Sequence, residues 1–246
     1  MGIRKKHNNF DWRVAKDQVK AAKIIGQNIS DDLARMGDEL VLLLISGGST
    51  LKVLEYIETT DWTKVTLFFL DERYSIDNSD SNFAQLLQLD WWVKVRDLGV
   101  RFVDSRVLPG EDLDVFSRRL DKNLQNWLET NPKGKKIAIM GMGLDGHTAG
   151  IFPYPEDPDL FAKLFDNKKF IVSHNVFGKN NFPQRVTTTF CFFDLLDKSY
   201  IYVCGEEKRE ALTKLKENRL PKHEFPAGII YNIKDVLLVT DIDLGK

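Results

Sequence analysis

Short apolar runs alternate with longer amphipathic stretches along most of the chain. Runs of about five residues that are apolar throughout are typical of strands buried on both faces of a parallel sheet. The amphipathic stretches between them have the length of crossover helices, so the pattern predicts βα units. The expected strands are residues 40–45, 65–70, 136–140, 170–173, 185–190, 200–204 and 236–240.

Apolar residues at helical spacing mark the longer stretches. Residues 14–36 predict an N-terminal helix, residues 113–128 a second and residues 206–218 a third. The apolar side of the first helix carries Val19, Ala22, Ile25, Ile29 and Leu33. Together these elements predict an α/β fold, in which a Rossmann-like, doubly wound, mainly parallel sheet is flanked by helices. We expect a single domain over residues 1–246, with the N-terminal helical segment 1–38 packed on it.

Composition narrows the classes of function. The chain has 35 basic and 36 acidic residues and a net charge of −1, which gives no support to a nucleic-acid partner. Cys191 and Cys204 are too few for a disulfide framework or a structural zinc site. The longest apolar runs have strand length, and no apolar run follows the basic N-terminus. We therefore expect a cytoplasmic protein with no membrane partner, no metal and no cofactor, either a monomer or a small homo-oligomer.

The segment Ser46-Gly47-Gly48-Ser49-Thr50 joins an expected strand to a helix-like stretch that runs to Ile57. Its two glycines allow close approach of a ligand, and the N-terminus of a following helix favours a phosphate group. Ser49 and Thr50 add hydroxyl donors. A plain βα turn with a Ser or Thr cap would have the same sequence, so both interpretations stand on the segment alone.

Asp71, Glu72 and Arg73 follow the next expected strand. Arg73 is suited to pair with a phosphate or carboxylate, and Asp71 to orient a base or bind a hydroxyl group. An exposed loop with an internal ion pair is the alternative. The segment Asp80-Ser81-Asn82 then predicts a cap for a helix that begins near Phe83.

The segment from Gly141 to Pro153 follows an apolar strand and contains glycines at 141, 143, 146 and 150. It places Asp145 two residues before His147, and histidine is the residue type most often used as a general base near neutral pH. A neighbouring carboxylate can orient such a histidine. The alternative is a helix start capped by Asp145 or Thr148, with a structural histidine.

Arg185 and Lys208 lie near two later strands and are candidates for a phosphate site, or else are solvated surface charges. The remaining histidines and a nearby lysine lie in polar segments and receive no role: His7, His174, Lys179 and His223.

Taken in order, these segments resemble the 6-phosphogluconolactonase family, a branch of a group that includes glucosamine-6-phosphate deaminase. The most specific match is Gly143 to Pro153. The resemblance is carried by Ser46–Thr50, Asp71–Arg73, Asp80–Asn82, Gly141–Pro153, Arg185–Thr187 and Gly205–Lys208. Phe152 separates the two branches, because the deaminases have a catalytic Glu at the matching position. The chain departs from the usual family pattern at Leu144, Gly150 and Tyr154.

The resemblance implies hydrolysis of 6-phospho-D-glucono-1,5-lactone, a sugar-phosphate lactone, in the pentose phosphate pathway without a metal. It implies His147 as the base and Asp145 as its support. Arg73 or an N–H of the Gly47-Gly48 turn would stabilise the oxyanion, and Asp71 and Gly146 would complete the site. The phosphate would lie against Ser46 to Thr50, with Arg185 and Lys208. A deaminase-like isomerase and a non-catalytic sugar-phosphate sensor are the competing interpretations.

Overall fold

A computed structural model describes residues 9–59, 61–176, 178 and 181–245 and confirms the predicted α/β class. His7 and Lys179 lie outside these residues. Seven strands form one sheet in the order β1-β10-β9-β6-β2-β3-β5, and every neighbouring pair is parallel. Their bounds are β1 Asn9–Val14, β2 Val41–Ile45, β3 Val65–Phe69, β5 Arg101–Phe102, β6 Lys135–Met140, β9 Lys198–Tyr202 and β10 Asp235–Thr240.

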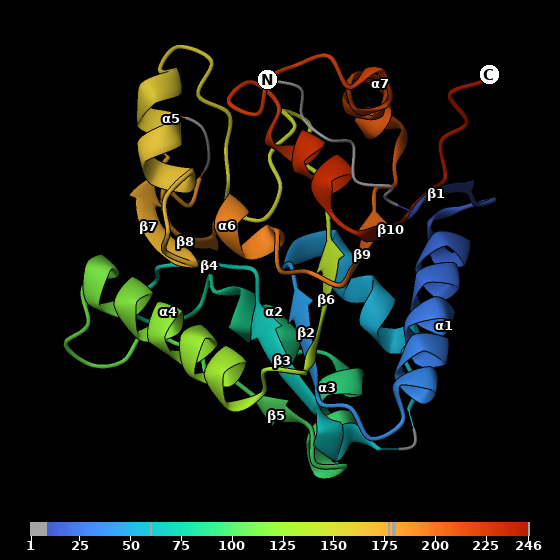
Figure 1. Cartoon of the computed structure of the whole chain (residues 1–246), viewed down its shortest axis with the longest axis vertical. Helices are drawn as coiled ribbons and strands as arrows, with labels where there is room; N and C mark the ends of the chain where they lie inside the picture. Colours follow the sequence, from blue (N-terminus) through green and yellow to red (C-terminus); the bar gives the residue numbers. More distant parts are fainter. Residues whose placement is uncertain (1–8, 60, 177, 179–180, 246) are drawn as a thin grey trace.

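Side chains that alternate along each strand fill two cores, one on each face of the sheet. In β2, Leu42 and Leu44 join one core, and Leu43 and Ile45 join the other. The second core is covered by α1 (Gln18–Met36), the 3-10 helix η1 (Gly48–Tyr56), α2 (Asn82–Leu87) and α3 (Asp90–Asp97). The first core is covered by α4 (Leu113–Thr130), α5 (Pro158–Phe165), α6 (Phe190–Phe193) and α7 (Arg209–Glu217). Figure 1 shows α1 and α4 on opposite sides of the sheet, as in a doubly wound fold.

Two of the expected strands lie in a second sheet that the sequence pattern did not predict. β7 (Ile171–Asn175) and β8 (Gln184–Thr188) are antiparallel to each other, and β4 (Asp71–Arg73) pairs with β8. Residues 176–183 between β7 and β8 are too few for a parallel crossover, which needs about a dozen residues. The expected strand 185–190 also ends early, because Phe190 begins α6.

The N-terminal segment differs from its prediction as well. Residues 9–14 form an edge strand, which pairs with β10, and α1 begins only after Asp17, whose side chain accepts a hydrogen bond from Lys20 N. Val19, expected on the apolar side, is 63% exposed, whereas Ile25 and Ile29 are buried as predicted. Since Asn9, Asp11 and Arg13 are polar, β1 lacks the continuous apolar pattern of a buried strand and was not predicted.

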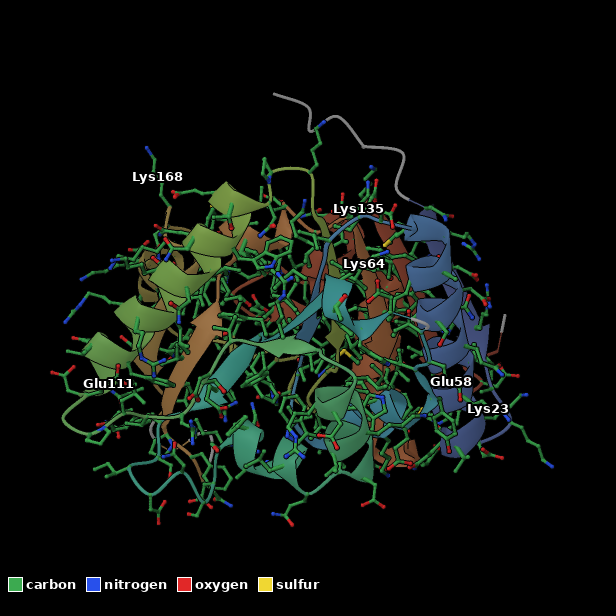
Figure 2. All side chains as sticks on the ribbon, turned by 90° about the horizontal axis from the view of Figure 1, so that it is seen from below. Lys23, Glu58, Lys64, Glu111, Lys135 and Lys168 are labelled. Carbon is green, nitrogen blue, oxygen red and sulfur yellow. The ribbon has the colours of Figure 1, made fainter. Side chains whose placement is uncertain are left out.

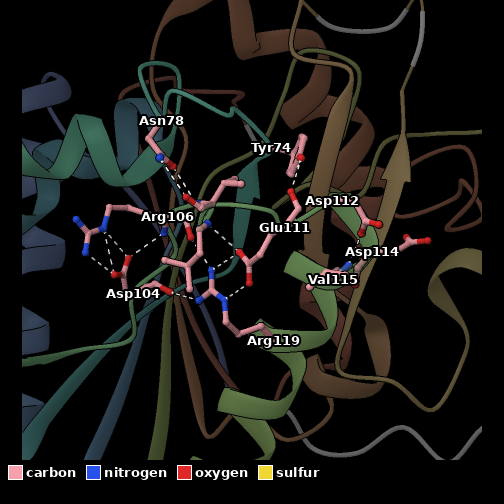
Figure 3. Close-up of polar contacts among 12 residues, drawn as sticks. Tyr74, Asn78, Asp104, Arg106, Glu111, Asp112, Asp114, Val115 and Arg119 are labelled. Atoms are coloured by element: carbon pink, nitrogen blue, oxygen red, sulfur yellow. Dashed lines mark hydrogen bonds and ion pairs between the residues drawn. The ribbon is translucent and has the colours of Figure 1, made fainter.

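Charged side chains lie mainly at the periphery, where Figure 2 shows Lys23 and Lys168 extending outward. A network of charged side chains orders the connection from β5 to α4 (Figure 3). The Arg119 guanidinium donates to the Glu111 carboxylate at 2.6 and 2.9 Å and to the carbonyl of Asp104 at 2.9 Å. Asp112 then caps α4 by accepting from Val115 N at 2.7 Å. Among the described residues, no helix is both long enough and apolar enough to span a membrane.

The strand order places two loops at the centre of the sheet. From β2 the chain continues to β3 on one side, whereas β6 lies against β2 on the other side. The direction of winding therefore changes between β2 and β6. A crevice is expected beyond the carboxyl ends of strands at such a switch point. The loops that follow these two strands are Ser46–Thr50 and Gly141–Pro153.

Candidate active site

A cavity of about 210 Å³ lies at this switch point. Ten of the predicted site residues line it: Ser46, Gly47, Gly48, Ser49, Thr50, Asp71, Arg73, His147, Arg185 and Lys208. The lining also includes Asn82, expected only as part of a helix cap, and five residues of the long glycine-rich loop: Gly141, Met142, Gly143, Ala149 and Phe152. Residues far apart in the sequence thus meet around one small cavity.

His147 lines the cavity and forms a hydrogen-bonded pair with Asp145, a predicted site residue that is not part of the lining. His147 Nδ1 lies 2.6 Å from Asp145 Oδ1, and the same oxygen accepts from His147 N at 3.1 Å. Because an ionised carboxylate only accepts hydrogen bonds, the proton of a neutral His147 belongs on Nδ1. Burial alone would raise the pKa of Asp145, but the hydrogen bond and charge of His147 lower it below its ordinary value. Asp145 is therefore ionised at neutral pH, and Nε2 of His147 is left to accept a proton.

Packing fixes the orientation of the imidazole. Phe152 is 1% exposed and stacks on His147, with ring centroids 4.4 Å apart and planes 22° from parallel. On another side, a Cβ atom at Gly143 would overlap the His147 ring and lie 2.6 Å from Asp145 Oδ1. The absence of a side chain at residue 143 therefore makes room for the His147–Asp145 pair.

Gly146 does not line the cavity, although the sequence predicted that it would contact the substrate. Its φ is +82°, and a Cβ atom there would overlap the ring of Phe225. Its carbonyl accepts from Ala227 N at 2.9 Å, and its N–H donates to Gly143 O at 3.2 Å. Gly146 thus shapes the turn between Asp145 and His147 from behind.

The Ser46–Thr50 loop forms another wall of the cavity, which all five of its residues line. Thr50 Oγ1 donates to the carbonyl of Ser46 at 2.7 Å, so its hydroxyl proton serves the loop itself. The Gly48 N–H donates to Gln85 Oε1 at 3.1 Å, so this N–H already has a partner in the protein. Ser46 Oγ is buried and has no hydrogen-bond partner. The expected helix after the loop is the 3-10 helix η1.

Three cationic side chains reach the cavity from different elements. The Arg185 guanidinium pairs with the buried carboxylate of Asp71, and Arg73 Nη1 donates to the carbonyl of Asp80 at 3.0 Å. Lys208 Nζ donates to the carbonyl of Met142 at 2.8 Å. Burial lowers the pKa of Lys208 and also that of Arg73, which Arg185 lowers further.

The Nε atoms of Arg73 and Arg185 are buried without hydrogen-bond partners. A buried donor without a partner is costly, and an anion in the cavity would relieve that cost. The site thus concentrates positive charge in a chain whose net charge is −1.

Glu72 is a buried carboxyl group that the sequence did not assign to the site. It accepts hydrogen bonds from Asn82 N at 2.5 Å, Arg73 N at 2.8 Å and Phe83 N at 3.0 Å, and from Ser105 Oγ at 3.0 Å. Burial raises its pKa to about 7 despite these donors. Glu72 therefore connects the β4 segment to the start of α2, from which Asn82 reaches the Ser46–Thr50 loop.

Three further residues named in the sequence analysis lie at or near the site or outside it. Ser81 caps α2 as predicted, since its Oγ accepts from Ala84 N at 2.9 Å. His223 lies outside the cavity lining, and His174 is buried behind it. Within the described ranges, no three His, Cys, Asp or Glu side chains come together in a way that could hold a metal ion.

Comparison with known proteins identifies the family. The family described as Glucosamine-6-phosphate isomerases/6-phosphogluconolactonase matches residues 16–239. The chain belongs to this family. It is 30% identical over 201 residues to the 6-phosphogluconolactonase of Helicobacter pylori, covering 80% of this chain and 81% of that protein. It is 27% identical over 210 residues to the 6-phosphogluconolactonase of Nostoc sp., covering 82% of each.

A solved structure of a family member has the same fold. The 6-phosphogluconolactonase from Plasmodium vivax superposes with a TM-score of 0.74 at 20% identity, over 93% of this chain and 88% of that one. Both activities appear in the family description, so membership by itself leaves two reactions to separate. The residue at position 152 bears on that separation.

Proposed function

We propose that this protein hydrolyses 6-phospho-D-glucono-1,5-lactone to 6-phospho-D-gluconate, a reaction of the pentose phosphate pathway. The observation that carries the proposal is the 2.6 Å contact between His147 Nδ1 and Asp145 Oδ1 in a cavity lined by cations. The names of the two bacterial relatives support the same reaction.

In this mechanism His147 is the general base. Nε2 takes a proton from a water molecule as the water oxygen attacks the lactone carbonyl carbon. The tetrahedral intermediate then collapses, the bond to the ring oxygen breaks, and His147 returns the proton to that oxygen. Asp145 stabilises the imidazolium that exists between the two steps. Acid–base assistance of this kind contributes roughly 10²–10⁴-fold to the rate.

The cations divide between the two ends of the substrate. The phosphate lies against the Ser46–Thr50 loop, where Ser46 Oγ and Arg185 Nε are buried donors without partners. Lys208 adds a third positive group, and its pKa is lowered chiefly by burial. Arg73 stabilises the oxyanion of the intermediate. Asp71 acts by holding the guanidinium of Arg185 in place.

The deaminase alternative loses a required group at residue 152. Phe152 lies directly under the His147 ring, where its side chain can pack but cannot transfer a proton. The sensor alternative gains no support from the N-terminal residues that the structure describes, since these contain β1 and one helix. Release of ammonia from glucosamine 6-phosphate would favour the deaminase. Binding of phosphate esters without turnover would favour the sensor.

The test is lactone hydrolysis on freshly prepared substrate, corrected for spontaneous hydrolysis, by the wild type, His147→Ala and His223→Ala. We expect kcat of His147→Ala to fall by about 10²–10⁴-fold. His223 lies outside the cavity lining, so its variant is the control and should keep the wild-type rate. Wild-type activity at background level would refute the function, and an unchanged kcat in His147→Ala would refute the base.

We also propose a cytoplasmic location, in keeping with a phosphorylated substrate, and a monomer or small homo-oligomer that acts without a nucleic-acid partner. Fractionation of cells and light scattering of the purified protein test these points.

A further inference from the structure

His174 is a buried histidine behind the cavity that the mechanism above does not use. It lies on β7 opposite Arg185 of β8, and it is 5% exposed. Its Nε2 is 2.8 Å from the carbonyl oxygen of Gly150, which can only accept a hydrogen bond. Nε2 must therefore carry a proton. The Phe165 ring packs edge-on against the imidazole, with centroids 5.0 Å apart.

The backbone of Gly150 is bound by residues of two strands of the small sheet. His174 of β7 binds its carbonyl, and Thr187 Oγ1 of β8 accepts from its N–H at 3.0 Å. There is no space for a side chain at this position, because a Cβ atom would lie 2.9 Å from Thr187 Cβ and 3.3 Å from Asp71 Cβ. Gly150 thus sits closer to β8 than any other residue type allows.

This attachment reaches residues of the active site. Ala149, immediately before Gly150, lines the cavity and has a positive φ of +48°. A non-glycine residue adopts that conformation only where its surroundings hold it there. Phe152, two residues after Gly150, stacks on His147. The position of the Gly150 peptide therefore determines the support beneath the proposed base.

The second imidazole nitrogen has its own contact. Nδ1 of His174 lies 3.5 Å from the Tyr154 hydroxyl, which donates to the carbonyl of Asn175 at 3.1 Å. Gly150 and Tyr154 are thus the polar neighbours of the two ring nitrogens of His174. Burial, with a smaller contribution from the Arg185 charge, lowers the pKa of His174 to about 4. The side chain therefore stays neutral at physiological pH.

We propose that His174 is a positioning residue for the reaction: its neutral imidazole, protonated on Nε2, holds the Gly150 carbonyl and so fixes Ala149 and Phe152 against His147. The inference rests on the proposed function, because its effect on turnover is an effect on lactone hydrolysis. The tautomer and the attachment of the loop, however, can be measured without turnover.

The variants are His174→Phe, which removes the donor, and His174→Gln, whose amide nitrogen can donate in place of Nε2. We expect His174→Phe to lower kcat about tenfold to a hundredfold, as misplaced catalytic groups do, with KM within about threefold of wild type. His174→Gln should recover most of the loss, and the control His223→Phe should match the wild type. A merely structural role would lower the active fraction and leave kcat per folded molecule unchanged.

Two measurements need no activity. Nitrogen-15 NMR of the wild type should show His174 as the neutral Nε2–H tautomer between pH 6 and about 8, the range in which free histidine titrates. Amide protons of Ala149 and Ile151 should exchange faster in His174→Phe than in His174→Gln. An Nδ1–H tautomer, a charged His174 at pH 7, or equal kcat in His174→Phe and wild type would overturn the inference. Absence of activity in the wild type would refute the proposed function alone, and the NMR result would still decide the role of His174.

Discussion

The two loops at the switch point are built in opposite ways. The Ser46–Thr50 loop has few attachments to other segments: Ser46 N bonds to Ile139 O at 3.0 Å and Gly48 N bonds to Gln85. Within the loop, Thr50 Oγ1 donates to the Ser46 carbonyl, whereas Ser46 Oγ has no partner. The Gly141–Pro153 loop is bonded within itself, to Ala227 and to both β7 and β8. One loop leaves a donor available, and the other has its conformation fixed.

This difference corresponds to two tasks. A phosphate site needs donors that no protein group satisfies, since the ligand supplies the missing acceptor. A general base needs a fixed orientation, because small displacements of a catalytic group cost large factors in rate. Substitutions in the Gly141–Pro153 loop should therefore change kcat, and substitutions that disturb the Ser46–Thr50 loop should change KM.

Among substitutions that keep the proposed base, the largest effect on kcat is expected for Gly143→Ala. The added methyl group would overlap the His147 ring and press on Asp145, so the pair must move. We expect kcat to fall about a hundredfold with little change in KM. Gly228→Ala is the matched control, because its methyl group would lie 3.9 Å from its nearest neighbour. Steady-state kinetics give kcat and KM for both variants. A rise in KM with unchanged kcat for Gly143→Ala would contradict the division of tasks between the two loops.

The next prediction concerns Glu72, which helps to hold the start of α2 beside the Ser46–Thr50 loop, and its contribution to the free energy of unfolding. Its pKa is about 7 in the folded protein and near 4.5 when unfolded, so the folded state retains the proton that the unfolded state loses. The stabilisation is complete below pH 4.5 and is lost as the pH rises to about 7. The free-energy difference between wild type and Glu72→Gln should therefore decrease over this range, by at most about 3 kcal/mol.

Urea unfolding at several pH values measures this difference. Glu111→Gln is the control, because the hydrogen bond from Arg119 lowers the pKa of Glu111, and its contribution is lost only on acidification below pH 4.5. The difference between wild type and Glu111→Gln should stay constant above that pH. A constant difference for Glu72→Gln as well would show that Glu72 is ionised throughout.

The smallest effect is expected for Gly47→Ala. A Cβ atom there would overlap the amide of Asn82, which also donates to the carbonyl of Asp71 at 2.8 Å. The flexible end of Asn82 can yield, so the cost is modest and falls on the wall of the proposed phosphate site. We expect KM to rise about tenfold, equivalent to about 1.4 kcal/mol, with kcat nearly unchanged. A loss in kcat comparable to that of Gly143→Ala would contradict the prediction.

Features that depend on neighbouring residues were predictable from the sequence. Glycine-rich turns after apolar strands located both loops, because a buried strand and the turn that ends it have local signatures. Asp145 and His147 were paired correctly since they are two residues apart and meet across a single turn. The predicted residues that follow strands of the parallel sheet, such as Ser46 and His147, line one cavity because parallel strands all end at the same edge. Asp71, Arg73 and Arg185 reach the same cavity from the small antiparallel sheet, which the sequence pattern did not predict.

Features that depend on distant contacts were missed. β1 has alternating polar residues and is a strand only because β10 lies beside it. His174 lies in a polar segment, and its role depends on Gly150, a residue 24 positions earlier. Gly146 lies in a glycine-rich loop, as a substrate-binding glycine would. The structure gives another reason for glycine there, because a Cβ atom would overlap the ring of Phe225. No local pattern could have indicated these three pairings.

The pairing of β1 with β10 has a consequence for the order of folding. Asn9 to Val14 are made before every other strand of this sheet, yet their partner strand, Asp235 to Thr240, is made about 226 positions later. At roughly 5–20 residues per second, β1 waits on the order of ten seconds or longer on the ribosome before it can pair. The central strands β2 and β3 can associate long before then. The edge of the sheet that contains both β1 and β10 is therefore the last part of it that can form during translation.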